Sequence, residues 1–412
     1  MNILDRANLI APDYRENTIA NVPATIAALL GVQSPGLPPL RRSLWEPLLD
    51  DGDISRVVLV LVDGMGQNLV RHLDGDLTWL SNEANVAGEI TSLFPSTTVN
   101  ALSSLWTGVG PAQHGLVGLE MFFPQFGVMG QMLSLSPSFA RLPDALVHAG
   151  LDPHTFLPVP GFAEALAPVG IATYAVKHSS LVDSALSKMH SRGVKKGVGI
   201  VTAADMMWQV KELLESQPGQ KMFISAYWPA VDTLSHRYGF NHPAVAAELR
   251  AFLHVLKTEL MQSLDPEAGK GTVVLLTADH GQTITPPEQQ IFLEDHPELQ
   301  RHLLMRPAGE PRTAYLYARA GQKQPIINYI EDRLSHAAVA QDALESLQSG
   351  LFGPPPHADE TALRVGDVIV TMREGYSLLS RNSDRYIKQF IGRHGGLTAA
   401  EMEVPWYAFR LQ

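Results

Sequence analysis

The chain has 412 residues, of which 45% are hydrophobic and 18% are charged, so it can bury a large core as one or two domains. It has no cysteine, which excludes disulfide bonds, thiolate metal ligands and a cysteine nucleophile. The formal net charge of -11 argues against duplex nucleic acid or an anionic membrane as the main partner. A small anionic substrate stays compatible, because bound metal ions can reverse the local field.

The first 55 residues are expected to form an N-terminal arm with a helix over residues 18–30. The opening segment, MNILDRANLIAPDYREN, carries acids and lacks a long apolar run, and no uncharged run in the chain is long enough to span a bilayer. We therefore expect a cytoplasmic protein without a signal peptide or a membrane span. No pattern indicates its oligomeric state.

From residue 56 onward, apolar runs alternate with amphipathic segments, which is typical of an α/β layered fold with a central, mostly parallel sheet flanked by helices. Unbroken apolar runs predict strands that are buried on both faces. Strands are expected over residues 57–62 (VVLVLV), 171–176, 198–202, 221–227 (KMFISAY) and 272–277 (TVVLLT). Helices are expected over residues 67–73, 98–107, 203–216 and 243–264.

Residues 282–390 differ from the rest, with Pro-Pro pairs, arginine-rich spots, two strand patterns and one helix pattern. We interpret them as a smaller lobe inserted between two pieces of one catalytic core, residues 56–281 and 391–412. Residues 111–118 are predicted to form a glycine-bearing loop. The segment 119–160 is rich in Met, Phe and Pro, and its pattern indicates no particular elements.

Three of the predicted strands are followed by acidic residues, in the position where open α/β sheets place their sites. A mixture of carboxylate oxygen and imidazole nitrogen suits divalent ions in phosphoryl-transfer sites. Two ions about 4 Å apart would clamp the attacking and leaving oxygens of an in-line displacement. The residues concerned are Asp63 after strand 57–62, Asp232 and His236 after strand 221–227, Asp279 and His280 after strand 272–277, and His394 in the glycine-rich piece 392–396.

Two threonines, Thr97 and Thr98, stand where the predicted helix 98–107 begins. A threonine hydroxyl is a poor nucleophile at neutral pH, but coordination to a metal ion lowers its pKa. The free backbone N–H groups and the positive dipole end of a helix start favour a phosphate. We therefore hypothesise that Asp63 holds a metal and that one of these threonines is the nucleophile beside it.

With these residues, the sequence resembles the alkaline phosphatase superfamily, and most closely its nucleotide pyrophosphatase/phosphodiesterase branch. The resemblance extends from about Val57 to Pro405. The motifs that carry it occur in the order expected for the family. They are LVDGMG, FPSTTVNALSSLWTG, PAQHG, the Asp232-x3-His236 pair, TADHG and the HGG piece that contains His394.

The resemblance implies two metal sites, most simply for Zn²⁺, with Mn²⁺ as the alternative. One site would use Asp63, Asp279 and His280 together with the nucleophile, and the other Asp232, His236 and His394. The family's spacing from the Gly108 that closes its Thr-Gly pair implies Thr98 as the nucleophile, with Thr97 as the alternative. The implied reaction is hydrolysis of nucleotide-type or other small phosphodiesters and pyrophosphates through a covalent phospho-threonine intermediate.

The sequence departs from the family in its phosphate-binding residues. Leu119 stands near the position where related diesterases carry a phosphate-binding Asn, and we predict that Asn100 binds the substrate instead. No Arg follows Thr98 closely, as it does in the monoesterases of the superfamily, which favours diesters. The arginines that could still reach the site are Arg71, Arg312 and Arg393.

Two alternatives stay open. Within the same fold, the reaction could be phosphomonoester or phosphonate hydrolysis, or phosphate transfer as in a Mn²⁺ mutase; such mutases use a serine nucleophile, which argues against the last. Outside enzymology, the chain could be a non-catalytic member that binds phosphate ligands or a partner protein. The complete set of six metal-ligand residues argues against this second alternative.

Overall fold

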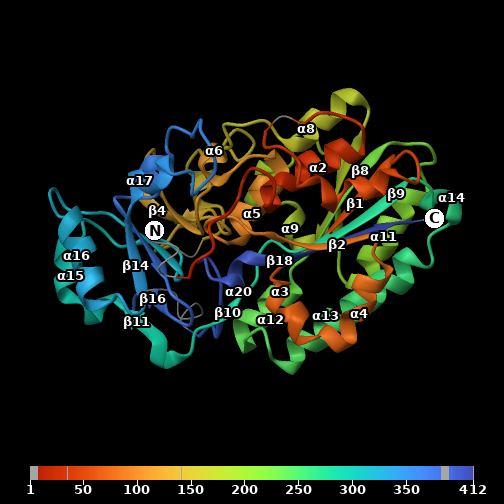
Figure 1. Ribbon diagram of the computed structural model, residues 1–412. Helices are drawn as coiled ribbons and strands as arrows, with labels where there is room; N and C mark the ends of the chain where they lie inside the picture. The colour runs from red at the N-terminus through yellow and green to blue at the C-terminus, as the bar shows by residue number, and fades with distance from the viewer. Residues whose placement is uncertain (1–7, 35, 141, 382–388, 412) are drawn as a thin grey trace.

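A seven-stranded sheet forms the centre of the computed structural model, which describes residues 8–34, 36–140, 142–381 and 389–411 (Figure 1). All of its strands run parallel except β18, which is antiparallel to both of its neighbours. In spatial order the strands are β2 (Val86–Thr91), β18 (Glu403–Arg410), β9 (Thr272–Thr277), β1 (Arg56–Val62), β8 (Met222–Trp228), β6 (Ala172–His178) and β7 (Lys196–Ile200). The prediction of a mostly parallel central sheet is confirmed.

Strand β1 lies in the middle of this sheet because every one of its residues is apolar and buried, apart from Arg56 at its start. It pairs in parallel with β8 on one side and β9 on the other. A strand covered on both faces needs a continuous apolar run rather than an alternating one, and in β1 Val and Leu supply it. The carboxyl ends of β1, β8 and β9 therefore meet at one edge of the sheet.

Helices cover both faces of the sheet, as Figure 1 shows. Along α13 (Pro243–Val255), residues Val245, Leu249 and Phe252 are buried, which is the one-sided spacing of an amphipathic helix. One face carries α2 (Val22–Leu29), α5 (Thr98–Thr107) and α8 (Phe162–Leu166), and the other α3 (Gln67–His72), α4 (Asp74–Glu83) and α13 (Pro243–Val255). Helix α11 (Ala203–Glu215) packs against β6, β7 and β8. The predicted helix 243–264 corresponds to α13 followed by a π-helical segment, η5 (Leu256–Met261).

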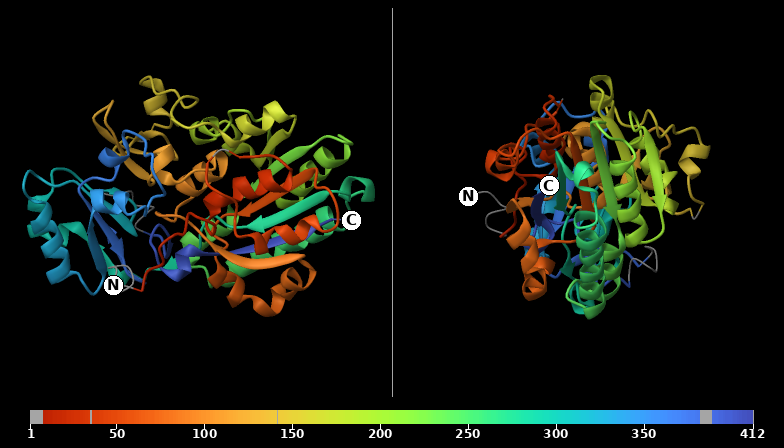
Figure 2. Two further views of the ribbon diagram at one scale, coloured as in Figure 1. Left: turned by 45° about the horizontal axis from the view of Figure 1, so that its top comes forward. Right: turned by 90° about the vertical axis from the view of Figure 1, so that its right-hand side faces the viewer.

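A second, antiparallel seven-stranded sheet lies beside the first, on the left in the left-hand view of Figure 2. Its strands, in spatial order, are β14 (Ala338–Asp342), β15 (Val368–Met372), β13 (Thr313–Leu316), β12 (Ala308–Gly309), β3 (Glu120–Phe123), β4 (Val128–Gln131) and β5 (Ser136–Pro137). Beside this sheet lie the helices α15 (Pro297–His302), α16 (Lys323–Arg333) and α17 (Ala343–Gln348). The segment 119–160 thus supplies three strands of this sheet, and the proposed lobe 282–390 supplies the other four. The domain boundaries themselves stay a prediction.

Shorter elements connect the strands and helices of the two sheets. Residues 111–118, expected to form a loop, begin with a short helix, α6 (Pro111–His114). The others are α7 (Ala145–His148), α9 (Ser179–Val182), α10 (Ala185–Met189), α12 (Ala230–Tyr238), α14 (Pro266–Gly269), α18 (Thr361–Arg364), α20 (Ala399–Met402), β10 (Thr283–Ile284), β11 (Gln290–Phe292), β16 (Ser377–Leu379) and β17 (Gly392–Arg393). In the described part of the chain, no helix combines the length and apolar character needed to cross a membrane.

Candidate active site

The three acidic clusters predicted from sequence meet at the carboxyl edge of the central sheet. Asp63 directly follows β1, Asp279 lies two residues after β9, and Asp232 lies in the first turn of α12, which follows β8. Gly64 makes this convergence possible: its φ is +73°, and a Cβ there would lie 2.9 Å from the Cα of Asp232. A residue with a side chain would therefore be strained and would push β1 away from α12.

His394 lies at the same edge of the sheet, although it is 114 residues beyond His280 in the sequence. It follows β17, which pairs antiparallel with β10, and β10 begins three residues after His280. The two imidazole rings stack with centroids 3.8 Å apart. The antiparallel pairing of β10 with β17 thus places His394 beside Asp279 and His280, which follow β9.

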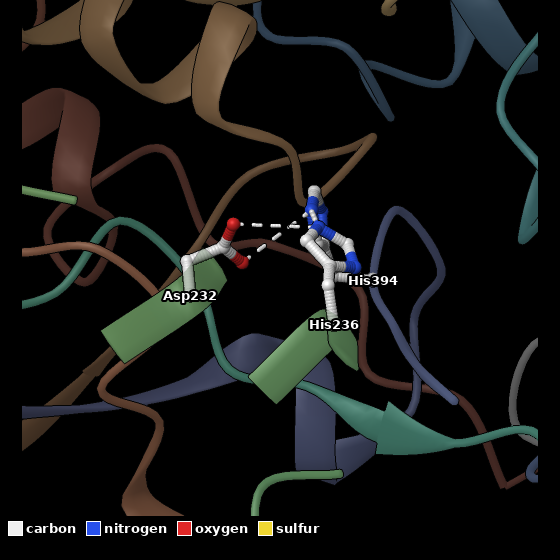
Figure 3. Close-up of side chains that lie close together, drawn as sticks. All are labelled: Asp232, His236 and His394. Atoms are coloured by element: carbon white, nitrogen blue, oxygen red, sulfur yellow. Dashed lines mark hydrogen bonds and ion pairs between the residues drawn. The ribbon is translucent and has the colours of Figure 1, made fainter. Parts of the chain in front are cut away.

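Two groups of side chains in the described residues have the geometry of metal sites, with their ligand atoms within 4.8 Å of one another. In the first group, Asp63, Asp279 and His280, all three side chains are buried. In the second group, Asp232, His236 and His394, the side chains turn toward one another, and two of them come from one helix (Figure 3). The Asp232 and His236 side chains are 12% and 17% exposed, so the second group reaches solvent.

Each histidine presents Nε2 to its group, because its Nδ1 faces a backbone carbonyl. The carbonyl partners are Gly281 for His280 (3.1 Å), Gly392 for His236 (2.8 Å) and Ser96 for His394 (3.0 Å). A carbonyl can only accept, so Nδ1 carries the proton and Nε2 keeps its lone pair. Burial, with His280 and His236 nearby, lowers the pKa of His394 well below its usual value, which keeps that ring neutral.

The carboxylates are arranged as metal ligands would be. One oxygen of Asp279 accepts from the N–H groups of Gly64 and His280, while its other oxygen, Oδ2, is buried and has no hydrogen bond to any described residue. Burial first, and then the nearby Asp279 and Asp232, raise the pKa of Asp63 well above its ordinary value. Three carboxyl groups this close repel one another unless cations or protons offset their charge. The residues present therefore fit a pair of divalent ions.

Two side chains that no sequence pattern indicated hold these carboxylates in place. The Tyr227 hydroxyl donates to Oδ2 of Asp63, and the Gln282 amide donates to both the side chain and the backbone carbonyl of Asp232. Tyr227 lies in β8 beside β1, and Gln282 follows His280 by two residues. Their roles depend on cross-strand geometry, which a single sequence does not reveal.

Thr98 is the first residue of α5, and its hydroxyl lies at the first metal-site group. Its Oγ1 is 3.1 Å from Nε2 of His280 and 3.5 Å from Oδ1 of Asp63. Its side chain is half-buried, whereas the side chain of Thr97 is buried and interacts with Glu310. Of the two threonines considered from sequence, the one that the structure brings to the metal-site residues is Thr98.

Asn100, the predicted substrate-binding residue, is fully buried and donates from Nδ2 to the Pro95 carbonyl at 3.3 Å. Its Oδ1 has no hydrogen bond among the described residues. A substrate contact by Asn100 therefore stays a prediction. The backbone N–H of Leu119, which stands near the family's usual Asn position, donates to Oε1 of Glu310 at 3.1 Å.

The three arginines considered from sequence are engaged elsewhere. Arg71 pairs with Glu89 and Glu403 at the surface. Arg312 and Glu401 form an ion pair in which both side chains are 0% exposed. The Arg393 Nε donates to the hydroxyl of Thr285. None of these contacts directs a guanidinium toward Thr98.

The family model for type I phosphodiesterase / nucleotide pyrophosphatase matches residues 57–397. No curated protein matches the chain in a sequence comparison. The family match includes all six metal-site residues and Thr98, although it assigns no role to any of them.

Solved structures with similar folds include proteins of two kinds. Murine ectonucleotide pyrophosphatase/phosphodiesterase 5 has a TM-score of 0.64 and 17% identity, covering 86% of this chain and 87% of its own. An inactive threonine-to-alanine form of that protein, in complex with AMP, has a TM-score of 0.62 and 16% identity, with the same coverage. Phosphonoacetate hydrolase from Sinorhizobium meliloti, in complex with phosphonoformate, has a TM-score of 0.61 and 19% identity, covering 86% of this chain and 90% of its own. At these identities the likeness shows the fold, which is that of the alkaline phosphatase superfamily.

Proposed function

We propose, from the premise that the chain belongs to the type I phosphodiesterase / nucleotide pyrophosphatase family, that it hydrolyses small phosphodiesters through a covalent phospho-threonine intermediate. One observation carries the proposal: the Thr98 hydroxyl, at the start of a helix, lies 3.1 Å from His280 and 3.5 Å from Asp63. Both residues belong to one candidate metal group, and the second group adjoins it through the stacked His280 and His394 rings.

In the first step, Oγ1 of Thr98 loses its proton and attacks phosphorus, the bond from phosphorus to the leaving oxygen breaks, and that oxygen takes up a proton and leaves as the alcohol. In the second step, water attacks phosphorus, the bond to Oγ1 breaks, and the threonine regains its proton. Divalent ions held by the two groups would lower the pKa of the Thr98 hydroxyl and offset negative charge on the phosphoryl and leaving oxygens. The N–H groups at the start of α5 favour a phosphoryl group beside Thr98.

Diesters are the proposed substrates because the site has few positive side chains to offset a dianion. The arginines considered from sequence interact with other protein groups: Arg71 with Glu89, Arg312 with Glu401 and Arg393 with Thr285. A diester carries one negative charge and needs less neutralisation than a monoester. The complex of the murine relative with AMP is in keeping with a nucleotide-type substrate.

We further propose Zn²⁺ as the metal, with Mn²⁺ as the alternative, and a cytoplasmic location. The mixture of three carboxylates and three imidazoles suits Zn²⁺, which binds both ligand types. Metal analysis of the purified protein tests this assignment. About two zinc ions per chain are expected, whereas no bound metal and no turnover on adding Zn²⁺ would favour a non-catalytic binding protein.

The reaction is tested by comparing the turnover of p-nitrophenyl thymidine monophosphate, p-nitrophenyl phosphate and phosphonoacetate. The diester is expected to have the highest kcat/KM. Preference for the monoester or the phosphonate would instead assign one of the other hydrolase reactions of the superfamily. The assay includes Thr98→Ala protein as the blank for contaminating phosphatases.

A further inference from the structure

A cavity of about 320 Å³ lies between strands β12 and β16 and helix α15, beside the second sheet. We call it the lobe cavity, and its walls include Leu119, Leu293, Leu303, Met305, Leu378 and Glu310. Protein interiors are close-packed and hold few voids larger than a water molecule, whereas small-molecule sites start at roughly 300 Å³. The size of the lobe cavity is therefore that of a ligand site rather than of a packing defect.

The lobe cavity adjoins the candidate active site through one side chain, Glu310. The Glu310 carboxyl accepts from the Leu119 N–H at 3.1 Å and interacts with the hydroxyl of Thr97. It also lies against Gly395, where a Cβ would be only 2.7 Å from Oε2. Thr97 immediately precedes the nucleophile, and Gly395 immediately follows the metal-site residue His394. A substrate held at Thr98 therefore has the lobe cavity next to it.

The walls of the lobe cavity are mainly apolar, and the described residues that line it include no aromatic side chain. Leu293, Leu303 and Leu378 are 5–7% exposed, so little of their surface meets water. A nucleobase would find no ring to stack on, although stacking is a main source of base affinity. The walls suit an aliphatic group, for which burial of each methylene is favourable.

The charges around the lobe cavity also disfavour an anionic occupant. Arg306 is paired with Glu120 at 3.1 Å, so its charge is offset. Glu294, another wall residue, accepts from the Ser380 hydroxyl and the Arg381 N–H, which contribute to holding its pKa below the ordinary value. A second phosphate would therefore lie near the ionised carboxylate of Glu294.

We propose that the lobe cavity binds one uncharged aliphatic substituent of the phosphodiester substrate, next to the phosphorus attacked by Thr98. This inference rests on the proposed function and narrows its substrate class from nucleotide diesters to diesters that carry an alkyl chain. Specificity would then depend on residues from the second sheet and its helix, while the reaction depends on the central sheet.

The turnover test compares n-alkyl p-nitrophenyl phosphates with methyl, butyl and hexyl chains. Each methylene that enters the lobe cavity should raise kcat/KM by roughly fourfold, so the hexyl ester should exceed the methyl ester at least about tenfold. Met305→Trp should abolish this preference by filling the lobe cavity. The matched control is Leu304→Trp, because Leu304 is 59% exposed and does not line the lobe cavity. It should keep the preference.

A binding test separates failure of this inference from failure of the proposed reaction. Metal-loaded Thr98→Ala protein is titrated with hexylphosphonate and methylphosphonate in a calorimeter. Tighter binding of the hexyl compound, lost in Met305→Trp but kept in Leu304→Trp, supports the lobe cavity even if no ester is turned over. Equal affinity for the two compounds, or a hexyl preference that Met305→Trp leaves intact, overturns it.

Discussion

The phenol of Tyr227 donates a hydrogen bond to Oδ2 of Asp63, while Oδ1 of the same carboxylate faces both His280 and Thr98 at 3.5 Å. The two oxygens of Asp63 are thus distinguished: one is held by the neighbouring strand and the other points toward the nucleophile. Partners of this kind orient metal ligands and tune their affinity.

Replacing Tyr227 by Phe should therefore weaken metal binding at the group of Asp63, Asp279 and His280 by roughly 10- to 100-fold, because Asp63 loses the bond that orients it. Competition titration with a chromophoric chelator measures the two sites separately. Tyr329→Phe is the matched control, since it removes a phenol bond to His296 away from the metal groups. Equal two-site affinities in wild type and Tyr227→Phe would contradict this role.

Thr98→Ala should reduce turnover at least about a thousandfold while both metal ions stay bound, because the nucleophile is lost and all six ligand residues remain. Thr97→Ala should cost less than about tenfold, since Thr97 interacts with Glu310 rather than with the metal-site residues. Steady-state kinetics combined with metal analysis provide the comparison. The reverse ranking of the two variants would identify Thr97 as the nucleophile.

Removal of the metal ions should destabilise the protein, because it leaves Asp63, Asp279 and Asp232 close together without cations. Zn²⁺ at a hundredfold excess over its Kd should restore about 2.7 kcal/mol to the free energy of unfolding. Thermal denaturation with and without a chelator measures the difference. Asp279→Asn removes one of these three carboxylates and one metal ligand. Its metal-free form should therefore unfold at a higher temperature than metal-free wild type, and Zn²⁺ should stabilise it less.

Glu310 should make the metal-free protein less stable as the pH rises. Burial is the main cause that raises the pKa of Glu310 to about 8, whereas an unfolded glutamate titrates near about 4.3. Between these values the folded state binds the extra proton, so the free energy of unfolding falls as pH rises, by at most about 1.4 kcal/mol per unit.

Glu310→Gln removes this proton, so its stability relative to wild type should increase from pH 5 to pH 8 and then level off. Urea unfolding of both proteins at a series of pH values gives the difference directly. Glu374→Gln, a matched change at a glutamate outside the lobe cavity, is the control variant. A constant difference between Glu310→Gln and wild type across this range would show that Glu310 ionises as it does in the unfolded chain.

The sequence by itself determined the elements that are local and strongly patterned. The apolar runs that became β1, β8 and β9 could be predicted because a strand buried on both faces must be apolar throughout. The residues after them could be predicted to meet because parallel strands share their carboxyl edge. The spacing of Asp232 and His236 places both on one face of a helix. For the choice of Thr98 over Thr97 and for the pairing of ligands into two sites, the resemblance to a family was needed.

Only the tertiary structure decided what depends on distant pairing. In the second sheet, β3 pairs with β12 through Glu120 and Gly309. Strands as short as these have too few residues to show a period, so the segment 119–160 gave no prediction. The bonds of Tyr227 to Asp63 and of Gln282 to Asp232 require neighbours that only folding brings together. The same holds for Glu310, which is remote in sequence from Thr97 and Gly395 and yet contacts both. Local patterns record burial and backbone geometry, whereas contacts between remote segments leave no periodic trace in one sequence.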